Sequence, residues 1–113
     1  MAFPVLKPNA TQAEFDELLA QARKASELLK ALSHETRLLV LCLLSESEKS
    51  VSELEEIMSL PQAAVSQQLA RLRIDGLVET RREGRMIYYR IASEEVGTII
   101  EQLYSLFCAP VRS

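Results

Sequence analysis

The sequence predicts a mainly α-helical protein that carries one small β-hairpin. Three observations support this fold class. Apolar residues recur at helical spacing in several separate stretches. Pro61 and Gly76 stand where helices typically begin and end. Residues 78–91 are rich in Val, Thr, Ile and Tyr and contain a Glu83-Gly84 turn signal, which is typical of a hairpin.

The N-terminal third is predicted to form an arm and two helices. Residues 1–9 contain two prolines and are expected to be a flexible arm. From Ala10 to Leu32 there is no Gly or Pro, and the apolar residues recur at helical spacing. They are Phe15, Leu18, Leu19, Ala22, Ala25, Leu29 and Leu32. Ser33 is predicted to cap a second helix, which runs to about Ser45 through the apolar stretch RLLVLCLL and is therefore expected to be buried.

Two further helices are predicted to follow in close succession. The sequence SELE at residues 52–55 is a capping box that starts a short helix ending near Ser59. Pro61 suits the first turn of the next helix, because its missing N–H is not needed there. This helix should run to about Asp75, where Gly76 supplies the left-handed residue that stops it.

The hairpin is expected to consist of strands Val78–Arg82 and Arg85–Ile91, joined by Glu83-Gly84. Tyr88 and Tyr89 are adjacent on the second strand and must point to opposite faces, so one should face the core and the other should be partly exposed. Two helices followed by a hairpin have the order of a winged helix-turn-helix.

One more helix is predicted after the hairpin. Ser93 caps it, and it should run from about Glu94 to Phe107. Its apolar positions are Val96, Ile99, Ile100, Leu103, Leu106 and Phe107. Residues 10–108 are thus predicted to form a single domain, followed by a C-terminal tail at 109–113.

The net charge of −3 conceals an uneven distribution. Residues 1–60 carry 6 basic and 10 acidic side chains, whereas residues 61–91 carry 6 arginines against 3 carboxylates. Positive charge is therefore concentrated on the segment that a helix-turn-helix would present to phosphate groups.

The helix after Pro61 is predicted to read DNA. Val65, Leu69 and Leu72 share an apolar stripe that would pack on the preceding helix. The opposite side is small and polar, so it could enter a major groove, where Gln and Ser bond to base edges or phosphates. The candidate DNA-binding residues on this helix are Gln62, Ala63, Ser66, Gln67, Gln68 and Arg71.

Arg81, Arg82 and Arg85 flank the predicted hairpin turn and complete the candidate DNA-binding set. Arginines at a wing tip can reach a minor groove or the flanking phosphates. The alternative is a winged-helix module for protein contact, which needs neither these arginines nor the Gln and Ser face. An enzyme is disfavoured, because the sequence offers no nucleophile–base pair, phosphate loop or carboxylate pair.

The segment LKALSHETRLLVLCLL…VSELEEIMSLPQAAVSQQLARLRIDGLVETRREGRMIYYRI resembles the ArsR/SmtB family of bacterial winged-helix repressors, over about residues 25–108. The resemblance implies a homodimer in which the first and last helices pack across the two-fold axis. It also implies binding to an imperfect inverted repeat of double-stranded operator DNA and release when an inducer is sensed. Two apolar helix stripes in a 113-residue chain are an independent argument for the dimer.

The sequence lacks the ligand patterns of metal-sensing members of this family. Those members place a cysteine pair at the start of the first DNA-contacting helix, or His and carboxylate ligands on the last helix. Here the first site reads SVSELEEIM, and the last helix has no histidine. A structural or solvated role is predicted for His34, so we expect no metal site and no other cofactor.

Cys42 and Cys108 remain as candidate sensor thiols. Cys42 lies within an apolar helix, where a lone cysteine is usually a small core residue, and Cys108 is predicted to end the last helix. Their positions and the phrase KALSHETRLLVLC resemble the dithiol branch of the family, which responds to persulfides, polysulfides or other oxidants. The resemblance implies a bridge from disulfide to tetrasulfide that releases the operators of sulfide-detoxification genes. The alternatives are a general thiol redox repressor using a disulfide, and two inert cysteines.

A cytoplasmic location without membrane contact is expected. No apolar run reaches membrane-spanning length, and the first residues lack the charged and apolar regions of a signal peptide. Two cysteines 66 positions apart do not make a secreted disulfide scaffold.

Overall fold

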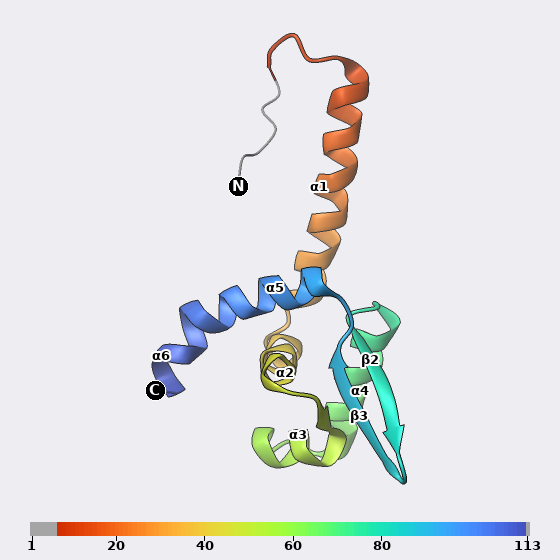
Figure 1. The fold of residues 1–113 in the computed structure, drawn as a ribbon, viewed down its shortest axis with the longest axis vertical. Coiled ribbons are helices and arrows are strands. Elements are labelled where there is room, and N and C mark those ends of the chain that lie inside the picture. Colours follow the sequence, from red (N-terminus) through yellow and green to blue (C-terminus); the bar gives the residue numbers. More distant parts are fainter. Residues whose placement is uncertain (1–6, 113) are drawn as a thin grey trace.

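The computed structural model describes residues 7–112, so most of the predicted N-terminal arm lies outside the described part. The elements are α1 (Gln12–Leu32), α2 (Glu35–Glu46), β1 (Lys49–Ser50), α3 (Val51–Met58), α4 (Gln62–Ile74), β2 (Val78–Glu83), β3 (Met86–Ile91), α5 (Glu94–Leu103), the π-helical turn η1 (Tyr104–Cys108) and α6 (Ala109–Arg112). Helices α2, α3 and α4 form a body with the hairpin, from which α1 and α5 leave in different directions (Figure 1). The predicted fold class, mainly α with a small hairpin, is confirmed.

The junction between α1 and α2 differs from the prediction. The Ser33 hydroxyl donates a hydrogen bond to the carbonyl of Lys30 at 2.8 Å, so Ser33 closes α1 instead of capping α2. The N-cap position of α2 is His34, whose side chain makes no capping bond. Helix α2 is buried as predicted, and its residues Val40, Leu41, Cys42, Leu43 and Leu44 lie in the core.

The capping box of α3 begins two residues earlier than predicted. The Ser50 hydroxyl accepts from the Glu53 amide at 3.2 Å, and the Glu53 carboxylate accepts from the Ser50 amide at 3.1 Å. Ser50 is also the last residue of β1, a two-residue strand that the sequence did not predict and that pairs with β3. A strand this short shows no alternation of apolar and polar residues, and only its pairing defines it.

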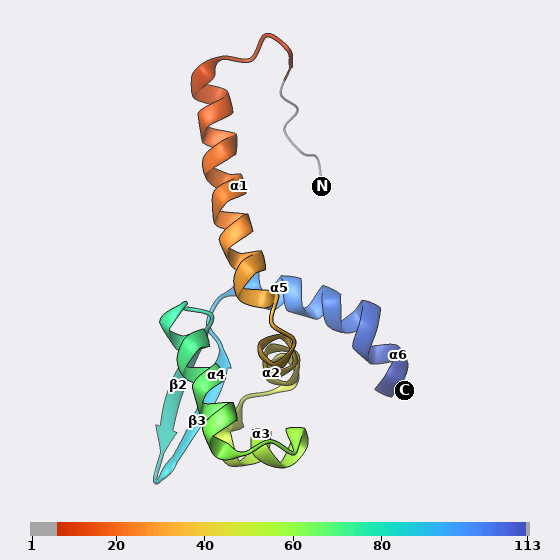
Figure 2. The same ribbon diagram turned by 180° about the vertical axis from the view of Figure 1, so that it is seen from behind.

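The hairpin forms a three-stranded antiparallel sheet with β1, in the order β1-β3-β2. Glu83 pairs with Met86, so the turn residues are Gly84 and Arg85, one position later than predicted. Gly84 has φ +62 and Gly76 has φ +74, the left-handed conformation that glycine tolerates best. Helix α4 lies behind the hairpin in Figure 1 and in front of it in Figure 2, so it packs against one face of the sheet.

Tyr89 faces the core, whereas Tyr88 lies on the other face of the hairpin beneath Arg81. The prediction that one tyrosine faces the core and the other is partly exposed is confirmed. Because paired residues of neighbouring strands share a face, Arg81 and Tyr88 lie on the side of the sheet away from the core.

The C-terminal helix is longer than predicted. Ser93 caps it as expected, accepting from the Val96 amide at 3.1 Å. The predicted end near Phe107 is wrong, because α5 passes through the π turn η1 into α6, and residues 109–112 continue the helix. In a regular α-helix the ring of Pro110 would clash with the carbonyl four residues before it. The wider turn directly before this proline is consistent with relief of that clash.

The two projecting helices make the chain extended. Its radius of gyration is 17.3 Å, against about 13 Å for a compact chain of this length. Both projections carry large apolar side chains exposed to solvent: Phe15, Leu18 and Leu29 on α1, and Leu106, Phe107 and Val111 on η1 and α6. None of the helices within residues 7–112 is long and apolar enough to cross a membrane.

Candidate DNA interface and sensor site

Helix α4 presents the face that the sequence predicts. Val65, Leu69 and Leu72 have no exposed surface and fix the helix to the core. On the opposite side Gln62, Ala63 and Gln67 are exposed, and Ser66 is half-buried. The sharp turn before α4 passes through Ser59, which has φ +53. The side of α4 that the sequence predicts to read DNA thus faces solvent.

Two other predicted residues of α4 already have partners within the chain. The Gln68 side-chain oxygen accepts from Arg37 Nε at 3.2 Å, and Arg37 Nη1 also donates to the Ala31 carbonyl at 3.4 Å. Arg71 forms an ion pair with Asp75 at 3.4 Å. Arg37, on α2, thus links the end of α1 to α4, and Gln68 is its hydrogen-bond partner on α4.

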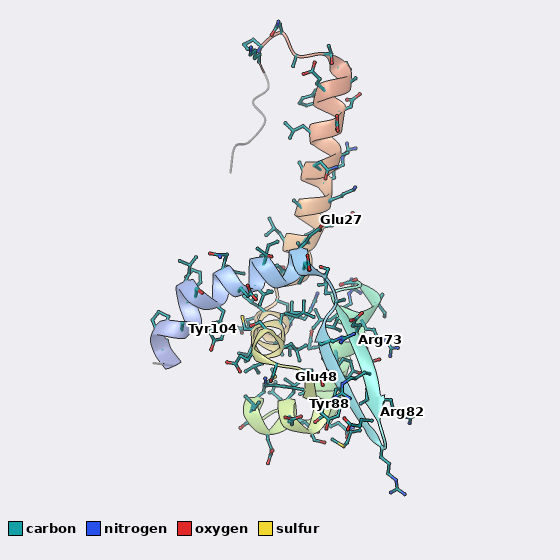
Figure 3. All side chains as sticks on the ribbon, in the orientation of Figure 1. Glu27, Glu48, Arg73, Arg82, Tyr88 and Tyr104 are labelled. Atoms are coloured by element: carbon teal, nitrogen blue, oxygen red, sulfur yellow. The ribbon has the colours of Figure 1, made fainter. Side chains whose placement is uncertain are left out.

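The three wing arginines are not equivalent. Arg82 and Arg85 are exposed near the turn, and Figure 3 shows Arg82 on the outer part of the hairpin. Arg81 instead donates from Nε to Glu48 at 2.7 Å and from Nη1 to Glu83 at 2.9 Å. Its guanidinium also lies 4.7 Å from the centre of the Tyr88 ring. Arg81 therefore joins the segment before β1 to the hairpin.

The contact with Glu48 changes the proton affinity of both groups. Hydrogen bonds from Arg81 hold the pKa of Glu48 below its usual range. Hydrogen bonds to Glu48 and then to Glu83 raise the pKa of Arg81. Sequence reasoning missed this pairing, because Glu48 lies 33 residues before Arg81 and no local pattern connects them.

Only part of the positive charge of residues 61–91 is free of ion pairs within the described part of the chain. Arg71, Arg81 and Arg90 are in ion pairs, the last with Glu79 at 2.7 Å. The remaining arginines of this segment take part in no ion pair within the described part of the chain. They are Arg73, Arg82 and Arg85. Arg73 was not among the predicted residues. It is exposed, and the helical periodicity places it on the side of α4 that carries Gln62 and Ser66.

The two cysteines lie side by side between α2 and η1, and both are free thiols. Cys42 is only 5% exposed, whereas Cys108 is half-buried at the edge of the core. Burial, together with the charge and hydrogen bonding of the Cys108 thiol, raises the pKa of Cys42 to about 11. Cys108 occupies the last position of the π turn, not the end of the helix as predicted.

A second contact joins the same two elements one turn away. The Tyr104 hydroxyl donates to Glu46 Oε2 at 2.8 Å. Lys49 Nζ lies 3.7 Å from Glu46 Oε1 and donates to the Leu43 carbonyl at 2.8 Å. Sequence reasoning missed this contact, since Tyr104 and Glu46 are 58 residues apart.

The described residues contain no group of three or more His, Cys, Asp or Glu side chains that could hold a metal ion. His34 is exposed at the start of α2. Its place agrees with the solvated role predicted for it.

Comparison with known proteins identifies the family. The family model described as "Bacterial regulatory protein, arsR family" matches residues 34–80. The biofilm growth-associated repressor of Agrobacterium fabrum is 46% identical over 96 residues, which cover 82% of each chain. The chain belongs to the ArsR family. As an ArsR protein it is a DNA-binding transcriptional regulator and not an enzyme. This assignment favours DNA binding over the alternative of a module for protein contact.

A second relative of this ArsR protein is the transcriptional activator HlyU of Vibrio cholerae, 47% identical over 92 residues that cover 81% of this chain and 85% of the relative. The solved structure described as reduced HlyU from that species has a TM-score of 0.78 and 47% identity, covering 81% of this chain and 97% of the other. One relative is named a repressor and the other an activator, so what they share is transcriptional regulation by a winged helix.

Proposed function

We propose that this ArsR protein is a homodimeric repressor that releases operator DNA when sulfur bridges Cys42 to Cys108. The observation that carries the proposal is the contact between these thiols, which are 66 positions apart and face one another across α2 and η1. The inducer would be a persulfide or polysulfide, and the regulated genes those of sulfide detoxification.

The exposed apolar residues of α1, η1 and α6 support the homodimer. Leu106 and Phe107 are 67% and 68% exposed in the single chain, which is unfavourable for large apolar side chains in water. A two-fold axis through these helices would cover both surfaces. It would also present two copies of α4 to the half-sites of an imperfect inverted repeat, with Arg82 and Arg85 at the flanking DNA.

The burial of the two thiols assigns them different roles. Cys108 is more accessible, whereas Cys42 is almost fully buried and its pKa is raised to about 11, so Cys42 forms the reactive thiolate less readily than a thiol of ordinary pKa. The Cys108 thiolate therefore attacks first, at the central sulfur of a trisulfide R–S–S–S–R, and displaces one RS⁻.

The second step closes the bridge. Cys42 gives its proton to the RS⁻ displaced in the first step and attacks the sulfur chain now attached to Cys108. Attack on the middle sulfur leaves a trisulfide bridge, and attack on the Cys108 sulfur leaves a disulfide. In both cases a second leaving group departs, the two protein thiols lose two electrons, and the polysulfide is reduced by the same two electrons.

The bridge would fix α2 to the helix that carries the dimer surface. Arg37 connects α2 to α4 through Gln68, so a change at α2 has a direct route to the DNA-reading helix. A coupling free energy of about 1–3 kcal/mol would weaken operator binding roughly 5- to 150-fold.

The second candidate is a general thiol redox repressor that responds to any oxidant through a disulfide. The contact between the two thiols favours it, because a direct disulfide needs Cα atoms within about 7 Å. A contact between the thiols is compatible with short and long bridges alike, so the inducer is distinguished by experiment.

Mass spectrometry of the reduced protein distinguishes the two candidates. The protein is treated with dimethyl trisulfide, glutathione disulfide or hydrogen peroxide, and the operator affinity of each product is measured by fluorescence anisotropy. We expect bridged, DNA-releasing protein mainly from the trisulfide. Equal release after peroxide would favour the general sensor.

The matched variants Cys42→Ser and Cys108→Ser should bind operator like the reduced wild type and should keep that affinity after treatment with the trisulfide. Cys108→Ser should gain no sulfur, whereas Cys42→Ser should retain an open adduct on Cys108. Normal release in either variant would contradict the dithiol mechanism.

A further inference from the structure

We propose that Tyr104 is a positioning residue for bridge closure: its hydroxyl, held by Glu46, fixes the π turn so that Cys108 faces Cys42. The inference rests on the proposed function, because closure of the bridge is the step that it concerns.

Two pairs of residues in contact, one helical turn apart, connect α2 and η1. On α2, Glu46 follows Cys42 by four residues, which is about one helical turn. On η1, Tyr104 precedes Cys108 by four residues. Cys42 faces Cys108, and one turn away Glu46 accepts the Tyr104 hydroxyl at 2.8 Å. The two elements are therefore joined at the reacting pair and once more beside it.

The acceptor of this hydrogen bond is itself held in place. Lys49 lies 3.7 Å from Glu46 Oε1 and is only 7% exposed. Its ammonium donates to the Leu43 carbonyl at 2.8 Å and to the Ser47 hydroxyl at 3.0 Å. A buried ammonium needs such partners, because its charge has lost most of its hydration. The Glu46 carboxylate is thus held between Lys49 and the phenol, and Tyr104 bonds to a fixed point on the body.

The element that Tyr104 fixes is an unusual one. The backbone N–H of Ala109 bonds to the Tyr104 carbonyl, five residues back, which is the π-helical pattern. Such turns are rare, and a return to regular α-helix would rotate Cys108 about the helix axis relative to Cys42. Tyr104 begins the turn and Cys108 ends it, so an anchor at the first residue sets the orientation of the last.

Bridge closure depends on this orientation more than the first attack does. The first attack is bimolecular, and the polysulfide can approach a half-buried Cys108 in several orientations. Closure is intramolecular and depends on the alignment of the Cys42 sulfur with the sulfur chain on Cys108. Losing the anchor should therefore slow closure while leaving the first attack unchanged.

The variant Tyr104→Phe removes only the hydroxyl. Reduced full-length protein is mixed with dimethyl trisulfide, quenched with acid at intervals, and the open adduct and the bridged product are counted by mass spectrometry. The first attack is measured separately in a Cys42→Ser background. We expect closure to slow about tenfold, the lower end of what a hydrogen bond to a charged group contributes. The rate of the first attack should stay within twofold.

Two further variants make the result specific. Tyr88→Phe removes a phenol hydroxyl from the wing and should close at the wild-type rate. Glu46→Gln keeps an oxygen that can accept from Tyr104 but loses the charge that pairs with Lys49, so closure should slow by less than in Tyr104→Phe. A slower closure in Glu46→Gln than in Tyr104→Phe would overturn the role given to the phenol.

The outcomes separate this inference from the function on which it rests. Wild-type protein that forms no bridge, or that keeps its operator affinity when bridged, would contradict the proposed function. Wild-type protein that bridges and releases DNA, with Tyr104→Phe closing equally fast, would contradict only the positioning role. Equal slowing of both steps would also contradict it, because a general loss of structure does not distinguish the two steps.

Discussion

The DNA-reading surface and the sensor that we propose for this protein are built in opposite ways. The reading surface, formed by α4 and the hairpin, uses exposed polar side chains from one stretch, residues 61–91. The sensor, formed by α2 and η1, depends on contacts between groups from distant parts of the chain, among them the buried Cys42 and the half-buried Cys108. On the reading side Gln67, Arg82 and Arg85 end in solvent, whereas on the sensor side the Glu46 carboxylate is held by both Lys49 and Tyr104.

This difference separates the expected effects of substitution. An exposed residue of α4 can be truncated with little effect on folding, so its loss should alter DNA affinity alone. A buried group of the sensor contributes to the stability of the reduced protein as well as to its chemistry. Measurements of stability therefore test the sensor, and measurements of affinity and salt dependence test the reading surface.

The largest expected effect is a pH dependence of stability that originates at Cys42. Burial and the neighbouring Cys108 thiol raise the pKa of Cys42 from its ordinary value of 9.0 to about 11. The folded protein thus keeps this proton where the unfolded chain has lost it. The contribution is fully present below the unfolded pKa and is lost as pH rises through about 11. The total is at most roughly 3 kcal/mol.

Urea unfolding of the reduced protein at fixed protein concentration measures this effect. The free energy of unfolding of the wild type should fall between about pH 9 and 10.5 more steeply than that of Cys42→Ala. Parallel curves would show that Cys42 titrates as it does in the unfolded chain, and the role of the buried second thiol would then need revision.

The next effect in size belongs to Gln67 on the exposed side of α4. A side chain that bonds a base edge contributes about 1–3 kcal/mol of discrimination, so Gln67→Ala should weaken operator binding roughly tenfold. Ser66→Ala should weaken it less, because Ser66 is half-buried. Affinity for an operator selected from random duplexes and for a scrambled duplex is measured for each.

A matched control comes from the next residue on the same helix. Gln68 is bonded to Arg37, so Gln68→Ala should leave the ratio of operator to scrambled affinity unchanged. If neither Gln67→Ala nor Ser66→Ala changes operator affinity, α4 is not the reading helix.

The elements that sequence analysis predicted well are those specified by nearby residues. The stripe Val65, Leu69 and Leu72 and the left-handed Gly76 are each fixed within one or two turns of helix. The capping box of α3 was misplaced because SVSE at residues 50–53 and SELE at residues 52–55 both fit the same pattern. The pairing of Ser50 with β3 favours the capping box at residues 50–53. This pairing is a tertiary contact, which a local sequence pattern does not contain.

The contacts of the proposed sensor could not be predicted from local sequence patterns. The contacts between Cys42 and Cys108 and between Glu46 and Tyr104 join residues more than fifty positions apart. The cysteines were identified from a family resemblance, and Tyr104 was not identified at all. One local signal was present: Pro110, two residues after Cys108, predicts a distortion of the helix before it.

The smallest expected effect separates the arginines of the wing, and it is measured best as salt dependence. Removing one side chain that neutralises a phosphate should reduce the slope of log affinity against log salt by about 0.9. Arg82→Ala with Arg85→Ala should therefore flatten the slope, and operator affinity should fall a few fold at moderate salt. Arg81→Ala should leave the slope unchanged, because its guanidinium is bonded to Glu48 and Glu83.

Arg90→Ala is the control for Arg81→Ala, since Arg90 is also in an ion pair on the same face of the hairpin. If Arg81→Ala flattens the slope and Arg90→Ala does not, Arg81 must leave Glu48 when DNA binds. The ion pair with Glu48 would then compete with the binding of Arg81 to DNA, and Glu48→Gln should strengthen operator binding. If neither changes the slope, Arg81 holds β1 to the hairpin in the free and bound protein alike, and the phosphate contacts of the wing belong to Arg82 and Arg85.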